Sequence, residues 1–349
     1  MNHEPDLFPA PEQELRLSPD FQDRVISRIH REHRIKKKAL NLGGACLLLT
    51  VSLFLHLRSP APAPSIAAQG RAASAAKGVA WLVKSQTAQG HWQSQDWGGH
   101  AAFNQGVSAL ATLALLQAPD PVPADILDKA IRALEKSLRE ADTSLEQGPE
   151  FYNRILTLNT LLEAEKTMPD PERKQLLQRE FASILRQQQR DGGWGYAASQ
   201  PLGYSERSEA NSAVTWWVCH LLRESAFLNL PGSETALQEG NQWLRNRRQP
   251  DGEMAYQPGA QSLSGPESAL FWMSALLYPV STDQKIESSD AYRDFFRLAA
   301  APDEKMLRGL QDQQSDTGSW ENAQDRWWRA GGKVYLTALS VLTQVPRGV

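Results

Sequence analysis

Hydrophobic positions in residues 72–349 follow a helical period, and two kinds of segment alternate along the chain. One kind carries many charges and a single apolar stripe, as a helix with one exposed face does. It occupies residues 72–87, 124–140, 172–189, 234–248 and 290–313. The other kind is apolar almost all round and starts near residues 104, 154, 211, 265 and 334. Because no run shows strand alternation with turn signals, the pattern predicts an all-α domain of five outer and five inner helices in two concentric layers.

A short motif recurs where the outer segments end. The stretches "KGVAWLVKSQTAQGHW", "SILRQQQRDGGW", "WLRNRRQPDGEM" and "GLQDQQSDTGSW" align without a gap. Spacing between the copies predicts a further, degenerate copy near residues 134–152. The shared columns hold Gln86, Gln188, Arg248 and Gln314, then Gly90, Gly192, Gly252 and Gly318, then Trp92, Trp194, Met254 and Trp320.

The residue types of the motif suit a helix end. Glycine supplies the positive φ that commonly ends a helix. Asp191 and Asp251 precede two of these glycines, where a carboxylate can accept backbone N–H bonds. The glutamine, one turn earlier, can bond to exposed backbone groups, and the tryptophan can fold back over it. We therefore expect the motif to fasten each outer helix to the connection that follows it.

This pattern resembles the QW motif of the terpenoid cyclase and protein prenyltransferase superfamily, known from squalene–hopene cyclase repeats. The third copy departs from it at Arg248 and Met254. The resemblance covers residues 72–349 and implies an α/α toroid whose inner helices surround a central cavity. We expect a bacterial member of this superfamily that is anchored in a membrane. Five outer/inner hairpins are fewer than the six or seven that the resemblance implies, so the ring is expected to be incomplete or opened.

The chemistry of that superfamily is not visible in the sequence. Its cyclases carry an Asp-x-Asp-Asp motif, which does not occur, and the nearest acidic pairs are Asp303-Glu304 and Asp290 with Asp294, expected in the polar outer layer. Its protein prenyltransferases hold zinc through Asp, Cys and His. The Cys219-His220 pair lacks an Asp at the preceding ligand position, which favours a buried cysteine and a core histidine. We expect no metal and no cofactor.

Aromatic residues on two neighbouring inner segments are candidates for a ligand site. Ser212 and Ser268 each stand four residues before a tryptophan, on the same helical face. In one interpretation these side chains line a pocket for a long apolar ligand; in the other they fill the interface between the two layers. The candidate ligand-binding residues are Trp216, Trp217, His220, Phe271 and Trp272.

The N-terminal part of the chain differs from the rest. Residues 39–57 carry no formal charge and nearly match the thickness of a bilayer core, with five basic residues shortly before them. This bias predicts a single-pass inner (cytoplasmic) membrane protein with residues 1–38 in the cytoplasm, as a tail with one short helix, and the toroid outside it. Residues 58–71 are expected to form a Pro/Ala linker. A cleaved signal peptide and a buried core helix are the alternatives.

The charge balance narrows the functional hypotheses. A net charge of -3 gives no global basic field, so nucleic acid is not expected as a partner. The first hypothesis is a non-catalytic, membrane-anchored toroid that binds a protein partner or an isoprenoid-like lipid. The alternative is a divergent terpene cyclase or prenyltransferase-like enzyme. A third hypothesis gives the N-terminal segment a regulatory contact with a cytoplasmic factor.

Overall fold

The computed structural model describes residues 66–345, apart from residues 141–148, 197–208, 260–262 and 279–288. The predicted tail 1–38, the predicted membrane helix 39–57 and the first part of the predicted linker lie outside the described residues. Within the described part, no helix is both long and apolar enough to cross a membrane. The chain divides into two units, and the fold below is that of the unit from Ser65 to Val349.

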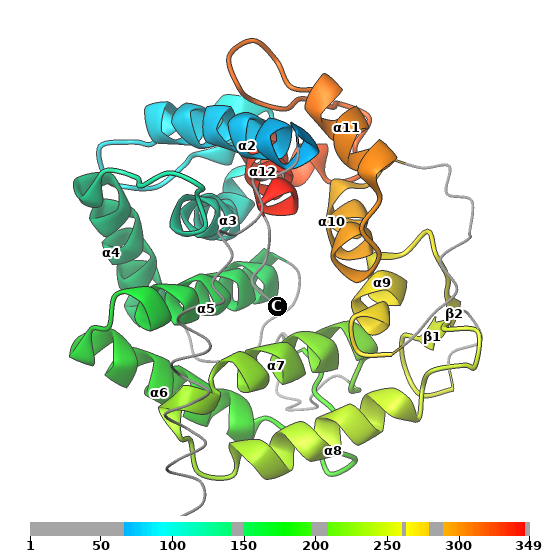
Figure 1. Ribbon diagram of the computed structural model, residues 1–349. Helices are drawn as coiled ribbons and strands as arrows, with labels where there is room; N and C mark the ends of the chain where they lie inside the picture. Colours follow the sequence, from blue (N-terminus) through cyan, green and yellow to red (C-terminus); the bar gives the residue numbers. More distant parts are fainter. Residues whose placement is uncertain (1–65, 141–148, 197–208, 260–262, 279–288, 346–349) are drawn as a thin grey trace, which may run out of the picture. The chain divides into compact units, whose positions relative to one another are not determined.

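Helices of this unit form an outer and an inner layer, as the two kinds of segment predict (Figure 1). Inner helix α3, for example, is buried along its whole middle, from Gly106 to Leu115. The outer helices are α2 (Ile66–Ser85), α4 (Ala124–Glu140), α6 (Pro171–Arg186), α8 (Ser233–Arg245) and α11 (Glu304–Asp312). The inner helices are α3 (Asn104–Leu116), α5 (Pro149–Thr167), α7 (Ser212–Glu224), α9 (Ala269–Ala275) and α12 (Trp328–Gln344).

The inner helices close into a ring. Each contacts the next in the order α3, α5, α7 and α9, and α12 in turn contacts α3. Helix α10 (Ala291–Ala300) lies between α9 and α12 and contacts both. The count of five hairpins suggested an incomplete or opened ring and did not decide closure; the ring of described helices is closed, because α10 supplies the wall that five inner helices lack.

Three local predictions need correction. The predicted outer helix 290–313 is two helices, α10 and α11, because Ala301 is extended (φ −144°, ψ 91°) before Pro302. The first outer helix starts at Ile66, earlier than predicted, since the segment that follows the prolines is rich in alanine. The loop before α9 also contains a short antiparallel pair of strands, β1 (Met254–Ala255) and β2 (Leu263–Ser264), where no strand was predicted.

The motif glycines all adopt positive φ: 89° at Gly90, 91° at Gly192, 97° at Gly252 and 95° at Gly318. Each stands in the turn after an outer helix. A side chain there would be strained, and it would also collide: a Cβ at Gly90 would lie 2.4 Å from the carbonyl oxygen of Lys129 on α4. The glycines are thus required both by the turn and by close contact with the next outer helix.

The motif glutamines join consecutive outer helices. Gln188 Nε2 donates to the Gly192 carbonyl (2.9 Å) and to the Ala236 carbonyl in the first turn of α8 (2.9 Å). Gln86 bonds in the same way to Gly90 and to Ile126 on α4. The link therefore runs from one outer helix to the next, and not only to the following connection as predicted.

The motif tryptophans complete the helix ends. The indole Nε1 of Trp194 donates to the Ile184 carbonyl (3.0 Å), which lies in the last turn of its own outer helix. Its backbone N–H donates to Thr215 Oγ1 on inner helix α7 (2.9 Å). Trp92 and Trp320 repeat both bonds with different partners. Each tryptophan thus ties an outer helix to the inner helix that follows it.

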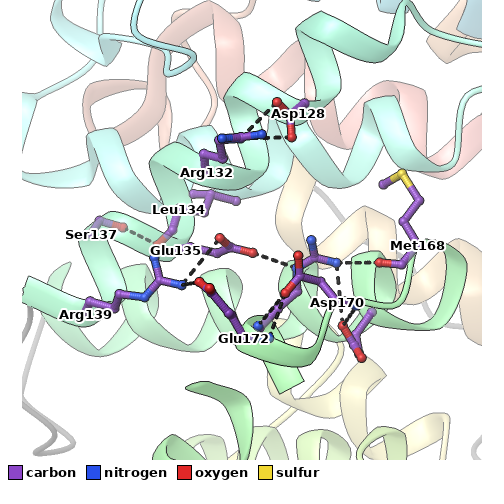
Figure 2. Close-up of polar contacts among 11 residues, drawn as sticks. Asp128, Arg132, Leu134, Glu135, Ser137, Arg139, Met168, Asp170 and Glu172 are labelled. Atoms are coloured by element: carbon purple, nitrogen blue, oxygen red, sulfur yellow. Dashed lines mark hydrogen bonds and ion pairs between the residues drawn. The ribbon is translucent and has the colours of Figure 1, made fainter. Parts of the chain in front are cut away.

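Between α4 and α6 the motif has degenerated, and ion pairs join the helices there (Figure 2). Arg173 Nε on α6 donates to Glu135 Oε1 on α4 (2.7 Å), and its Nη1 donates to the Met168 carbonyl (2.7 Å). Glu165, at the end of α5, lies 3.6 Å from Arg173 Nη1 and accepts from the Asp170 N–H. The side chains of Arg173 and Glu165 are only 8% and 5% exposed, so this is a buried network.

Candidate ligand-binding site

A cavity of about 630 Å³ lies between the inner helices and is lined mostly by their C-terminal halves. Residues of α3, α5, α7, α10 and α12 form its apolar wall, together with the residue that follows α9. Of the predicted ligand-binding residues, Trp216, Trp217 and His220 line it. The remaining apolar lining consists of Leu113, Leu116, Ala118, Leu162, Leu276, Phe295, Phe296, Leu342 and Val345.

The two tryptophans of α7 are held by their own hydrogen bonds. Trp216 Nε1 donates to the Met273 carbonyl (2.8 Å), and Trp217 Nε1 donates to the Tyr292 hydroxyl (2.9 Å). Their rings meet edge to face with centroids 5.3 Å apart. Since the indole N–H groups are already satisfied, what these rings offer the cavity is apolar surface.

His220 lies one helical turn after Trp216 and stacks on it, with ring centroids 5.3 Å apart and planes 8° from parallel. Its Nε2 is 3.2 Å from Asn159 Oδ1 on α5; because that oxygen can only accept, Nε2 carries the hydrogen of this bond. His220 therefore forms part of the cavity wall and links α7 to α5.

The polar rim of the cavity is made by three charged side chains. Lys166 Nζ lies 2.5 Å from Glu224 Oε2 and 3.7 Å from Glu163 Oε2. Burial tends to raise the pKa of Glu224, but its hydrogen bond to Lys166, with the charges of Lys166, His220 and Arg223, outweighs burial and holds that pKa below its usual value. Both rim carboxylates are thus near one ammonium group, and Glu224 is ionised at neutral pH.

Phe271 and Trp272 are not among the residues that line this cavity. Both are fully buried, and Trp272 Nε1 donates to the Pro266 carbonyl in the loop before α9 (2.8 Å). The two helices are out of register by one residue, because Ser212 is the first residue of α7 whereas Ser268 is the N-cap of α9. One residue is about 100° of rotation, enough to send equivalent side chains to different neighbours.

Sequence reasoning missed most of the cavity wall. Phe295 and Phe296 were assigned to the outer layer, although they line the cavity on α10. The remaining missed residues lie in the C-terminal halves of inner helices or just after them, including Leu116 of α3 and Leu342 of α12. Aligning the C-terminal ends of the apolar segments, and not their starts, would have brought these positions together.

Cys219 and His220 do not form a joint site. Cys219 is 1% exposed and lies against α8, where a Cβ at Gly240 would be 2.6 Å from its sulfur. Burial raises the pKa of its thiol to about 12. His220 lies toward the cavity instead, since adjacent residues on a helix point about 100° apart. Among the described residues, no three His, Cys, Asp or Glu side chains gather as metal ligands.

A second cavity, of about 300 Å³, holds carboxylates between α10, α11 and α12. Asp294 and Asp325 line it, and burial raises the pKa of both carboxyl groups. Arg293 donates to Asp294 Oδ1 (2.7 Å), and Asp325 accepts from the Ala291 N–H (2.7 Å). Asp290, predicted in the polar outer layer, is only 3% exposed and caps α10 by accepting from the Arg293 N–H. That prediction was wrong because α10 belongs to the inner ring.

Comparisons with known proteins support the fold. No protein-family model matches the sequence, and no curated protein matches it. Among solved structures, it is similar to GH76A, an α-1,6-mannanase from Salegentibacter sp. HEL1_6, with a TM-score of 0.54, 11% identity, and coverage of 78% of this chain and 98% of that one. An inactive variant of that enzyme in complex with α-1,6-mannotriose gives a TM-score of 0.51 at 12% identity, over 78% of this chain and 98% of that one.

The apo structure of the type II terpene cyclase MstE from Scytonema is a further match, with a TM-score of 0.41, 16% identity, and coverage of 81% of this chain and 98% of that one. At such identities the likeness concerns the fold alone. The fold is that of a helical toroid: inner helices enclosed by outer ones, as the layers predict. Chemically, the central cavity offers an aromatic and aliphatic wall with a charged rim.

Proposed function

We propose that this protein binds an elongated apolar ligand, such as an isoprenoid-like lipid, in the central cavity without transforming it. The observation that carries the proposal is the wall of the cavity: Trp216, Trp217 and Phe296 present apolar ring surface, and the indole N–H groups are already bonded within the protein. A volume of about 630 Å³ lies within the usual range for ligand pockets. The ionised groups of Lys166, Glu163 and Glu224 lie at the rim of the cavity and not in its apolar wall.

The test is a binding titration. We would measure binding of farnesol by calorimetry to the full chain in lipid nanodiscs, with empty nanodiscs as the baseline. Leu116 lines the cavity, so Leu116→Trp should fill part of it and weaken binding by at least about tenfold, equivalent to about 1.4 kcal/mol. Met168→Trp, at a 39% exposed site outside the cavity lining, is the matched control and should bind as the wild type does. No binding to the wild type, or equal binding to Leu116→Trp, would refute the proposal.

An enzymatic function is the alternative, and one observation favours it. Asp294 and Asp325 line the second cavity with raised pKa values, as groups that donate a proton often do. Both are engaged by Arg293 or by backbone N–H groups, which is why we place binding first. Incubation with squalene, geranylgeraniol or α-1,6-mannotriose, followed by mass spectrometry, should return each compound unchanged. A product that disappears in Asp294→Asn would establish the enzyme instead.

We propose further that residues 39–57 anchor the protein in the inner membrane, with residues 1–38 in the cytoplasm and the toroid outside it. The support is the uncharged run and its one-sided basic flank. A protein partner outside the cytoplasm is compatible with such an anchor. Alkaline phosphatase fused after Val349 should be active, and a green fluorescent protein fused there through the general secretion route should be dark. The reverse pattern, or a mature chain that starts after residue 60, would exclude this topology.

A further inference from the structure

The central cavity opens at the end of the ring where the inner helices terminate. Gln117 follows α3, Leu276 follows α9 and Val345 follows α12, and all three residues line the cavity. Lys166 and Glu224, near the ends of α5 and α7, line it as well, and their side chains are 34% and 36% exposed. This surface, at the C-terminal ends of the inner helices, is the mouth of the cavity.

The described part of the chain begins beside the mouth. An apolar groove of about 280 Å³ lies between α10, α11 and the end of α12, and Phe295, Leu342 and Val345 line both this groove and the cavity. Arg71 on α2 lines the groove too. Ile66, the first residue of α2, stands five residues before Arg71, which is about 7.5 Å along a helix. The N-terminal end of α2 therefore lies near the mouth.

The segment that precedes Ile66 is short. Residues 58–65, three of which are prolines, connect the proposed membrane anchor to α2. Eight residues of extended chain span at most about 25–29 Å. A compact domain as long as residues 66–345 has a radius of gyration of about 19 Å, which corresponds to a sphere about 50 Å across. Because the tether is shorter than the domain is wide, it holds the side that carries Ile66 close to the bilayer and the opposite side away from it.

Large apolar side chains are exposed just past the helix ends that form the mouth. Met168 follows α5, Phe227 follows α7 and Leu276 follows α9, and these side chains are 39%, 39% and 37% exposed. Trp327, just before α12 and thus at the other end of the ring, is 36% exposed. Exposure alone does not distinguish the two ends, but the position of the tether does. Apolar side chains held close to a bilayer gain free energy by entering its interfacial region.

We propose that the mouth of the cavity lies against the bilayer, so that the cavity opens to the membrane and not to water. Phe227 and Leu276 then lie in the membrane interface. The ligand is a lipid that resides in the membrane, because it reaches the cavity without exposing its chain to water, which would cost about 0.8 kcal/mol for each CH₂ group. This inference rests on the proposed function, since it uses both the membrane anchor and the apolar site.

Fluorescence quenching distinguishes positions that face lipid from positions that face water. The full chain with Cys46→Ser is prepared in nanodiscs with one added cysteine at a time: Phe227→Cys, Leu276→Cys or Trp327→Cys. Cys219 remains, because it is 1% exposed and burial raises the pKa of its thiol to about 12, so it does not react with the label. Each added cysteine carries the fluorophore NBD. Quenching is measured with a spin-labelled phospholipid in the bilayer and with iodide in the water.

Trp327→Cys is the matched control, because its site is similarly exposed and α12, with 17 residues or about 25 Å, separates it from the mouth. We expect the spin-labelled lipid to quench the labels at positions 227 and 276 at least about twofold, because interfacial side chains lie about 5–10 Å deep in the head-group region. Iodide should quench the label at position 327 and leave the other two largely unquenched. Equal quenching of all three labels by iodide would overturn the proposal.

The proposals fail separately. A chain that separates from the nanodiscs on gel filtration would refute the anchor, and the membrane-facing mouth with it. An anchored chain whose labels at positions 227 and 276 face water would refute the orientation of the mouth alone. If the labels behave as expected but farnesol does not bind to the wild type, the mouth still lies against the bilayer, and the lipid ligand is refuted.

Discussion

At the residue scale, an outer helix carries a small residue at the point where the motif tryptophan that follows the preceding outer helix packs against it. Gly78 and Gly240 stand twelve residues before the motif glycines Gly90 and Gly252. A Cβ at Gly240 would lie 2.7 Å from Cζ3 of Trp194, and one at Gly78 would lie 2.9 Å from Cζ3 of Trp320. On α4, Ala130 takes this place, in the same core cluster as Trp92.

The side chain at the equivalent position is larger where the preceding copy of the motif has no tryptophan. Glu180 follows the degenerate copy, and Met306 follows the copy that ends in Met254. A small residue in this column is thus a sequence signal for packing against the preceding copy. The contact between Gly78 and Trp320 also joins the first outer helix to a residue late in the chain.

We expect Gly240→Ala to lower the free energy of unfolding by about 1–3 kcal/mol, because the added methyl overpacks the contact with Trp194 and Cys219. Gly309→Ala is the matched control: Gly309 also lies in an outer helix, α11, but nothing stands within 4 Å of a Cβ there. That variant should gain about 0.5–1 kcal/mol from the better helix propensity of alanine. Urea denaturation of both variants measures the difference, and equal stabilities would rule out the packing argument.

At the element scale, the chain joins its outer helices in two different ways. Where the motif is intact, a glutamine bonds across to the next outer helix and a tryptophan packs on it: between α6 and α8, Gln188 donates to the Ala236 carbonyl and Trp194 packs on Gly240. Between α4 and α6, buried Arg173 takes over, held by Glu135 and Glu165. A buried ion pair of this kind has a desolvation cost that its partners offset only while all are present.

Removing one member of that network should therefore be costly. Arg173→Ala removes the cation beside buried Glu165 and leaves Glu135 with its longer pair to Arg139 (3.8 Å), and we expect a loss of about 3–5 kcal/mol in the free energy of unfolding. Arg132 on the same helix as Glu135 pairs with Asp128 at an exposed site, so Arg132→Ala should leave stability unchanged within measurement error. If thermal melting shows the two variants to be alike, the network does not replace the motif.

At the scale of the whole molecule, the closing contacts join residues far apart in the chain. Gln314 Nε2 donates to the Gly318 carbonyl (2.8 Å) and to the Ser74 carbonyl on α2 (2.9 Å). The last outer helix is thus tied to the first by the same motif that ties neighbours elsewhere. Closure makes the stability of the ring a property of all its helices together, because opening any join exposes the apolar faces of its neighbours.

Stability should pass through a maximum at mildly acidic pH. Burial raises the pKa of Asp294 and Asp325 in the folded protein above the unfolded value near 3.8, so folding takes up protons and stability rises as pH falls from neutral through those raised pKa values. The pKa of Glu224 is lowered instead; its contribution is complete above the unfolded pKa of about 4.5 and is lost as pH falls through its folded pKa.

Urea denaturation as a function of pH measures this profile. Asp294→Asn should flatten the rise between neutral and mildly acidic pH, because the neutral amide no longer titrates there. Glu224→Gln should reduce the fall below about pH 4.5. A wild-type profile that declines steadily from pH 7 downward would show that the two aspartates do not titrate as their burial implies.

The sequence by itself determined the two layers, the helix ends and the turns. These depend on local physics: the period of apolar residues, the positive φ of Gly90 and its equivalents, and the carboxylate of Asp191, which accepts the N–H of Gly193. The aromatic pair Trp216 and Trp217 on α7 was also identifiable, because a tryptophan in the middle of an apolar helix is expected to face either a core or a cavity.

The tertiary structure alone decided which of these side chains meet. The rotation of each helix about its own axis places Trp216 on the cavity and Trp272 elsewhere. The break before Pro302 turns α10 into the inner ring and brings Phe295 to both cavity and groove. The contacts of Gln314 with Ser74 and of Arg173 with Glu135 join different helices. Local patterns describe one helix at a time, whereas these contacts depend on how several rigid helices pack against one another at once.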